Sequence, residues 1–378
     1  MTLSKNRGYW RVNGECFDNK VKAILAAQHQ GLGFDDVSYH YNDEWYDQHD
    51  WSVEPKETLD ELYLKRAQQL REKYKTLILR YSGGADSLNI LRTFVDNNIK
   101  LDIVTMNEWH APGTDPWLSI ANVEKNLIAK PFVEDLVKKG ANFKVIVNDF
   151  SPTISVLGSD PGWIFDIDAP RFNCIDITAH RACTTEEFEE WNDPSTAVIV
   201  GVDKPKVWVR NGGKIWYFSQ NDTLHSMHNR ADHMIPEPFY WSADLPELVI
   251  KQCHVVKNYW RHHLDKVDIT ENDKQSIQKK TQVIPLIYPK YYGHLDPHAS
   301  ELPYWDHDDI NSQYRNGNHQ SPRGYGWDWE FHKSPYFKVW KDGIDLADRI
   351  IHRRFKTKDT IWENGLLVCR TKPRWLGK

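Results

Sequence analysis

Cysteine is scarce in this chain of 378 residues, and its positions form no familiar pattern. The five cysteines are odd in number and far apart, and no Cys-x-x-Cys pair occurs; they are Cys16, Cys174, Cys183, Cys253 and Cys369. A disulfide framework needs paired, closely spaced cysteines, so this spacing favours a protein of the reducing cytosol.

Long apolar segments are missing as well. No run of about 18 apolar residues occurs, which excludes a typical membrane-spanning helix. The first residues, Met1-Thr2-Leu3-Ser4-Lys5, lack the apolar stretch of a signal peptide. We therefore expect a soluble, cytoplasmic protein with no membrane partner.

Neither sign of charge dominates the chain. It carries 48 Lys and Arg against 53 Asp and Glu, a formal net charge of -5. Nucleic-acid binders usually show a basic excess, so composition does not indicate such a partner, although a local basic patch stays compatible with it. Hydrophobic residues make up 40% of the chain, enough for a substantial core.

Aromatic residues, in contrast, are abundant: 17 Trp, 17 Tyr and 14 Phe, many of them after residue 200. The simpler interpretation is a core and surface rich in large amphipathic rings. The alternative is a cleft that stacks a planar substrate such as a base.

Strand-like and helix-like segments alternate in the middle of the chain. Short apolar runs predict strands at 76–79, 101–105, 143–147 and 197–201, and the apolar period between them predicts helices at 86–96 and 118–139. Pro131 should kink or split the second helix, and Gly140 should end it. This order predicts an α/β fold with a parallel sheet covered by helices on both faces.

The two ends of the chain have a different texture. We expect a strand at 9–12 with a turn at Asn13-Gly14, helices at 20–29, 57–74, 244–264 and 343–353, a hairpin at 207–218, and loops from about residue 265. We therefore predict a small α+β extension at 1–70, a nucleotide-binding domain at 71–240, and a helical, loop-rich and aromatic-rich substrate region at 241–378.

The strongest local signal is the segment that joins the first of these strands to the helix after it. It reads Tyr81-Ser82-Gly83-Gly84-Ala85-Asp86-Ser87 and is called here the glycine loop. Two glycines let the backbone turn tightly, the helix N-terminus offers free N–H donors, and two hydroxyls add further donors. These features predict a phosphate site; an ordinary capped helix after a glycine turn is the alternative.

Asp86 fits a phosphate site only if a cation lies between the two negative groups. Magnesium takes oxygen ligands and is commonly shared by a carboxylate and phosphates. Asp86 is therefore a candidate metal ligand and a candidate catalytic residue.

The Ser-Gly-Gly-x-Asp-Ser segment resembles the PP-loop of the ATP pyrophosphatases, a superfamily of adenine nucleotide α-hydrolase-like enzymes. In architecture the resemblance covers about residues 72–205, and the whole chain also resembles uncharacterised PP-loop proteins of large bacteriophages, which would place it in the host cytoplasm. It implies a Rossmann-like, HUP-type sheet of five parallel strands, with ATP phosphates on the glycine loop. It also implies adenine near the end of the next strand, at Thr105, Met106 and Asn107.

Two further segments carry candidate site residues. Gly201, Asp203, Lys204 and Lys206 follow the fourth strand, where Asp203 could hold magnesium and a lysine could steady the leaving pyrophosphate. Arg171, after Asp166 and Asp168, could bind an anion. A polar turn and a solvated loop are the respective alternatives. Among the 17 histidines, His294 and His298 have a His-x-x-x-His spacing, but Pro297, a loop-like context and the lack of a clear third ligand argue against a metal site.

The resemblance implies an enzyme that cleaves ATP to AMP and pyrophosphate, with Mg²⁺, to activate an acceptor for amide or amine ligation. The expected acceptor is a small metabolite or a nucleobase, and the sequence is compatible with a homo-oligomer. The N-terminal part is too short for a glutaminase domain, and the tail around Cys369 does not match that of the PAPS reductases. A sulfurtransferase or reductase of the same fold and a non-catalytic nucleotide-binding module remain alternatives.

Overall fold

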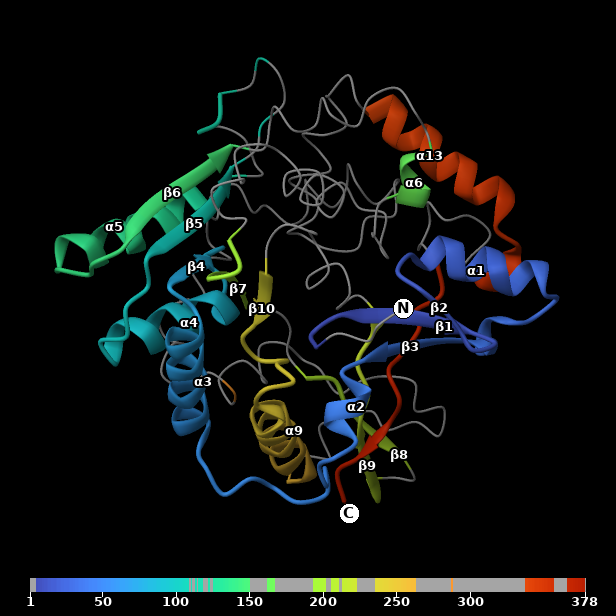
Figure 1. Ribbon diagram of the computed structural model, residues 1–378, viewed down its shortest axis with the longest axis horizontal. Helices are drawn as coiled ribbons and strands as arrows, with labels where there is room; N and C mark the ends of the chain where they lie inside the picture. The colour runs from blue at the N-terminus through green and yellow to red at the C-terminus, as the bar shows by residue number, and fades with distance from the viewer. Residues whose placement is uncertain are drawn as a thin grey trace.

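The computed structural model describes residues 5–108, 110, 113, 115–117, 122, 125–149, 162–166, 193–201, 205–210, 213–222, 235–262, 287, 337–356 and 366–377. Five parallel strands form its central sheet, in the order β6-β5-β4-β7-β10 (Figure 1). They are β4 (Thr76–Arg80), β5 (Ile103–Glu108), β6 (Lys144–Asp149), β7 (Thr196–Val200) and β10 (Ile235–Pro238). The predicted α/β class and the five-stranded parallel sheet are confirmed, and the arrangement is compatible with a Rossmann-like fold.

The order of the strands makes the sheet doubly wound. Counted along the chain it reads 3-2-1-4-5: the chain runs from β4 outward to β6 and then returns to β7 on the other side of β4. Ligands of such sheets bind where the direction reverses, beyond the carboxyl ends of the two central strands. Here that position lies between β4 and β7.

β10 is the strand that the apolar pattern did not reveal. Its sequence is Ile-Pro-Glu-Pro, and proline lacks the N–H that an interior strand must donate. Among the described strands, β10 pairs only with β7 and therefore lies at the edge, where proline is tolerated.

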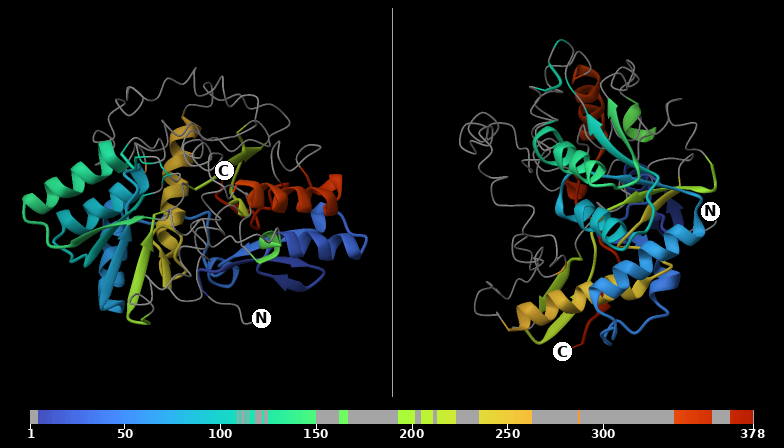
Figure 2. Two further views of the ribbon diagram at one scale, coloured as in Figure 1. Left: turned by 90° about the horizontal axis from the view of Figure 1, so that it is seen from above. Right: turned by 90° about the vertical axis from the view of Figure 1, so that its left-hand side faces the viewer.

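Helices pack beside this sheet (Figure 2). α3 (Leu59–Lys73) begins with a capping box and contacts both α4 (Ala85–Asp96) and α9 (Pro246–Arg261). The helix predicted at 118–139 is divided, as expected near Pro131: a π-helical turn, η3 (Lys125–Ala129), leads into α5 (Lys130–Lys138). Gly140 follows with φ +100°, which ends the helix as expected.

The N-terminal part forms a small antiparallel sheet of order β2-β1-β3. Its elements are β1 (Gly8–Val12), β2 (Glu15–Phe17), α1 (Lys20–His29), η1 (Phe34–Asp36), β3 (Val37–Tyr41) and α2 (Asp43–Tyr46). The predicted strand and helix are confirmed as β1 and α1. The predicted turn is confirmed as well, because Asn13 and Gly14 both adopt positive φ between β1 and β2.

A third sheet, of order β11-β9-β8, contains the predicted hairpin. β8 (Val207–Arg210) and β9 (Ile215–Phe218) are antiparallel, and β11 (Arg374–Trp375) adds to β9 from the far end of the chain. A short helix, η11 (Arg353–Phe355), precedes that last segment.

The predicted helix at 343–353 begins six residues earlier, as α13 (Phe337–Ile350). Gly343 is therefore in the helix interior and not at its start. A Cβ there would lie 2.1 Å from Nε1 of Trp163 in α6 (Trp163–Asp166), so this glycine makes room for an indole ring.

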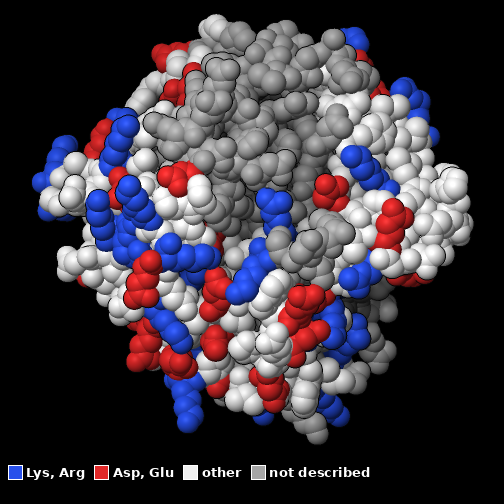
Figure 3. All heavy atoms as spheres, in the orientation of Figure 1, with Lys and Arg blue, Asp and Glu red and all other residues white. Residues whose placement is uncertain are grey.

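Most aromatic side chains of the described residues belong to the core. The largest fully buried ones include Trp10, Trp163, Trp216, Trp241 and Trp260. The interpretation of the aromatic excess as core packing is thus confirmed for these residues. Charged side chains of both signs are interspersed over the described part of the face in Figure 3.

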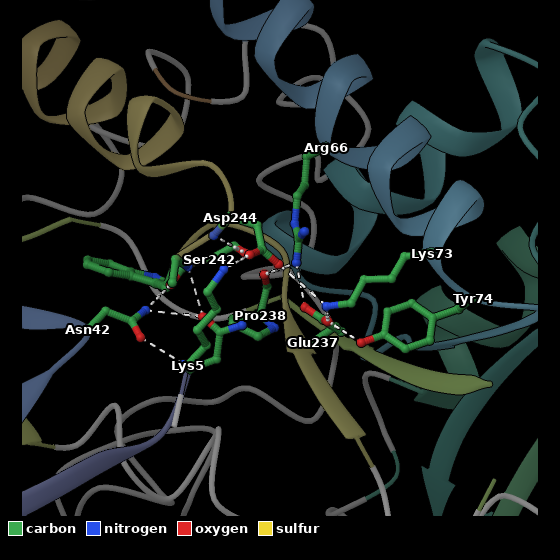
Figure 4. A network of polar contacts seen from close by, with 12 residues as sticks. Lys5, Asn42, Arg66, Lys73, Tyr74, Glu237, Pro238, Ser242 and Asp244 are labelled. Atoms are coloured by element: carbon green, nitrogen blue, oxygen red, sulfur yellow. Dashed lines mark hydrogen bonds and ion pairs between the residues drawn. The ribbon is translucent and has the colours of Figure 1, made fainter. Parts of the chain in front are cut away.

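A buried ionic network fixes β10 to α3 (Figure 4). Glu237 is 2% exposed and accepts hydrogen bonds from Arg66 at 2.7 Å, from Lys73 at 2.7 Å and from the Tyr74 hydroxyl. Burial alone would raise the pKa of the Glu237 carboxyl, but the Arg66 charge and the bonds from Lys73 and Tyr74 lower it below its usual value.

Candidate functional site

The glycine loop lies at the point where the winding of the sheet reverses. It joins β4 to α4, and the residue that follows the neighbouring strand β7 is Gly201. Tyr81, the first residue of the loop, is buried, and its N–H donates to the Thr105 carbonyl of β5 at 2.8 Å. The loop therefore starts from a position fixed by the sheet.

Gly83 makes the tight turn that the sequence predicted. Its φ is +84°, a conformation that favours glycine. A Cβ at this position would also lie 3.1 Å from Cβ of Ala129, the last residue of the π-helical turn η3. The backbone of the loop and that turn are thus in close contact.

Two serine hydroxyls hold the loop in shape. The Ser87 hydroxyl accepts from the Ser82 N–H at 3.2 Å and donates to the Gly84 carbonyl at 3.2 Å. The Ser82 hydroxyl accepts from the Gly84 N–H at 3.3 Å. Ser82 is exposed and Ser87 is buried, so Ser82 is the hydroxyl that solvent or a ligand can reach.

Gly84 is the N-cap residue of α4. Because glycine has no side chain, no group from the cap position itself fills the space at the helix N-terminus, where N–H groups and the helix dipole attract anions. Asp86 is in the first turn and half-buried. Donors and a carboxylate therefore occur together, which fits a phosphate bound with a cation.

Gly201 makes the second close approach to α4. A Cβ on this residue would lie 2.7 Å from Cδ1 of Ile90 and 3.3 Å from backbone atoms of Asp86 and Ser87. Its lack of a side chain thus allows the end of β7 to lie against the first turn of α4.

Tyr240 also contacts that turn and was missed by the sequence prediction. Its hydroxyl donates to the Asp86 carbonyl at 2.7 Å and accepts from Nδ2 of Asn89 at 3.1 Å. Tyr240 follows β10 and is fully buried. The run Phe239-Tyr240-Trp241 was a usable signal, but its partners could not be assigned without the position of β10.

The residues expected near adenine lie along β5. Thr105 and Met106 are 1% exposed, and Asn107 is half-buried. The side chains of Thr105 and Met106 are buried, so any contact to a base at these two positions would use backbone groups. Asn107 is the one of the three whose side chain is partly open.

A buried ion pair follows Asn107. Glu108 at the end of β5 bonds Lys125, the first residue of η3, and Lys125 is only 8% exposed. This pair links β5 to the turn whose last residue, Ala129, contacts Gly83. No spacing in the sequence indicated it, because 16 residues separate its two members.

Several predicted site residues lie outside the described residues: Arg171, Asp203 and Lys204. Lys206 is described and half-buried, and its backbone N–H donates to Oε1 of Gln220 at 3.3 Å just before β8. The structure thus brings together the glycine loop, Gly201 and the carboxyl end of β5.

The described residues contain no cluster of three or more His, Cys, Asp or Glu side chains arranged for a metal ion. A magnesium ion shared with phosphates needs only one or two carboxylates, and Asp86 supplies one at the glycine loop.

Burial makes the thiols of Cys253 and Cys369 weak acids. Burial raises the pKa of Cys253 well above its usual value, and burial is also the main reason why the pKa of Cys369 rises to about 12. Neither side chain therefore has the thiolate character of a reactive cysteine.

Within the part of the chain that the structure describes, no helix is long and apolar enough to cross a membrane. No protein-family model matches the chain, and no curated protein matches it in a sequence search.

Proposed function

We propose that this chain binds ATP on the glycine loop and cleaves it to AMP and pyrophosphate, which activates an acceptor for ligation. The observation that carries the proposal is the shape of the loop: a positive-φ glycine and an uncapped helix start, at the carboxyl end of β4 beside Gly201. Doubly wound sheets bind nucleotides at this position. The resemblance of the segment to the PP-loop adds the bond that is cleaved.

In this proposal the loop backbone and Ser82 bind phosphate oxygens, and Asp86, with Asp203, holds a Mg²⁺ that offsets the phosphate charge. Lys204, Lys206 and Arg171 are proposed to steady the leaving pyrophosphate, and the end of β5 at Thr105, Met106 and Asn107 borders the base. Charge neutralisation and positioning are the main contributions a protein makes to this chemistry. The proposed acceptor is a small metabolite or a nucleobase.

The first test measures ATP affinity with and without Mg²⁺ by calorimetry, using ATP in which a methylene group replaces the α–β bridging oxygen. We expect Asp86→Asn to abolish the magnesium dependence and Gly83→Val to abolish binding. Ser52→Ala is the matched control, because it removes a serine hydroxyl bound to Asp50 in an exposed loop. Unchanged affinity in Gly83→Val would refute the site.

The second test identifies the products by chromatography after incubation with ATP, Mg²⁺ and pools of candidate acceptors. AMP and pyrophosphate support the proposal, whereas ADP and phosphate contradict it. Tight, magnesium-independent ATP binding would favour the non-catalytic module. Loss of activity in Cys174→Ser or Cys183→Ser would favour the sulfurtransferase.

A further inference from the structure

One face of the β11-β9-β8 sheet carries a row of aromatic rings. Trp375 pairs with Tyr217, and Tyr217 pairs with Trp208, so the three side chains project from the same face. The Trp208 and Tyr217 rings are stacked, with an interplanar angle of 14°. The opposite face, with Val207, Phe218 and Arg374, packs into the core.

Two arginines lie on this row of rings. The Arg370 guanidinium lies 4.0 Å from the centroid of the Trp208 ring, and the Arg210 guanidinium lies 4.8 Å from that of Tyr217. Both residues are exposed, and Trp375 is 55% exposed. Trp208 and Tyr217 themselves are buried, so the aromatic–arginine face, defined here as Trp208, Arg210, Tyr217, Arg370 and Trp375, presents its two arginines and the Trp375 ring to solvent.

Among the described residues, no carboxylate forms an ion pair with the two arginines of this face, Arg210 and Arg370. Partial burial of the guanidinium is the main cause that lowers the pKa of Arg370; Tyr217 opposes it, and the like charge of Arg210 adds to it. Asp43 and Asp47 form ion pairs with Arg374, whose side chain is on the opposite face. Asp222, next to the bridge partner of Arg370, forms one with Lys20.

We propose that the aromatic–arginine face binds single-stranded nucleic acid. Unpaired bases stack on exposed aromatic rings such as Trp375 and on guanidinium planes such as those of Arg210 and Arg370, and arginines also bind phosphates. An acidic peptide would engage the arginines but would leave the exposed Trp375 ring without a stacking partner. The face is far along the chain from the glycine loop, and the inference does not depend on ATP binding.

The overall charge of the protein fits a small, local binding face. A net charge of -5 argues against a protein that coats nucleic acid non-specifically. A small face with two exposed arginines predicts modest affinity and a shallow salt dependence, because each phosphate contact to a single strand contributes about 0.7 to the slope of log K against log salt.

The test uses the full chain and a fluorescein-labelled, mixed-sequence RNA of about 12 nucleotides, with anisotropy measured from about 50 mM salt upward. We expect Trp375→Ala to weaken binding by about 5- to 150-fold, the range for one lost stacking contact. Trp375→Phe should restore most of the loss. The double variant Arg210→Gln/Arg370→Gln should reduce the salt slope by about 1.4.

The control variant is Arg92→Gln/Lys100→Gln, which removes two positive charges beside α4. It should bind as the unaltered chain does, and an equal loss there would show that only overall charge matters. The proposal is overturned if the RNA does not bind at low salt, or if Trp375→Ala binds within twofold of the unaltered chain. It is also overturned if a poly-glutamate peptide, or the same sequence as a duplex, binds this face as tightly.

Discussion

The buried carboxylate of β10 offers the sharpest test of how the candidate site is supported. In Glu237→Gln, the Arg66 guanidinium keeps its bond to the Pro238 carbonyl at 3.0 Å but loses its counter-charge at 1% exposure. Breaking a buried ion pair from one side typically costs about 3–5 kcal/mol. We expect the low end, about 3 kcal/mol, because glutamine can still accept one hydrogen bond.

Urea denaturation at neutral pH measures this loss as a change in the free energy of unfolding. Lys73→Met is the matched control: Lys73 bonds the same carboxylate but is 48% exposed, so its loss should cost no more than about 1 kcal/mol. A cost below about 1 kcal/mol for Glu237→Gln would refute the claim that this network anchors β10.

The same variant has a defined pH dependence. Because the folded-state pKa of Glu237 is below the usual 4.5, its contribution is complete above pH 4.5 and disappears as the pH falls toward the folded-state pKa. Stability of Glu237→Gln should therefore fall less steeply below pH 4.5 than that of the unaltered chain.

Three further predictions concern the support of the glycine loop and the core. Gly201→Ala should lower the free energy of unfolding by about 1–3 kcal/mol and weaken ATP binding, because its Cβ meets backbone atoms of α4. Adding Ile90→Val should recover only part of this lost stability. Full recovery would show that the strain lies in the Ile90 side chain alone. Tyr240→Phe should cost about 1–2 kcal/mol in urea denaturation, since Asn89 and the Asp86 carbonyl both lose the hydroxyl; no measurable cost would contradict the role of Tyr240. Burial lowers the pKa of His254 below its usual 6.5, so stability should fall as the pH drops below 6.5, where only the unfolded chain takes up the proton. His254→Gln should make this loss of stability with pH less steep. An unchanged pH dependence would assign the loss to other groups.

The sequence predicts the centre of this fold well and its edges poorly. Four of the five parallel strands are apolar runs that any helix-covered sheet requires, and they are found within a few residues of their predicted ends. β10 was not predicted because its two prolines contradict a strand pattern, and they are tolerated there because β10 lies at the edge of the sheet. β11 is two residues long and depends on a partner that is more than 150 residues away.

The candidate site divides in the same way. The glycine loop is local, so its turn and its helix start are legible in seven consecutive residues. Its supports come from elsewhere: Tyr240 after β10, Ala129 at the end of η3, and the Glu108–Lys125 pair. Hydrogen bonds and ion pairs between distant segments have no period or spacing, so the sequence contains their members without indicating their pairing.

The way in which the loop is enclosed bears on what it can do. Gly83 contacts Ala129 on one side, and Gly201 contacts the first turn of α4 on the other, with distances too short for larger side chains. A loop that only capped a helix would not need close approach from two other segments, because a serine or aspartate at the cap position would stabilise the helix more. The small residues Gly83, Ala129 and Gly201 instead let the loop and the first turn of α4 lie close to η3 and to the end of β7. The close packing around the loop and the glycine at the N-cap of α4 are the two features that the proposed phosphate site would explain.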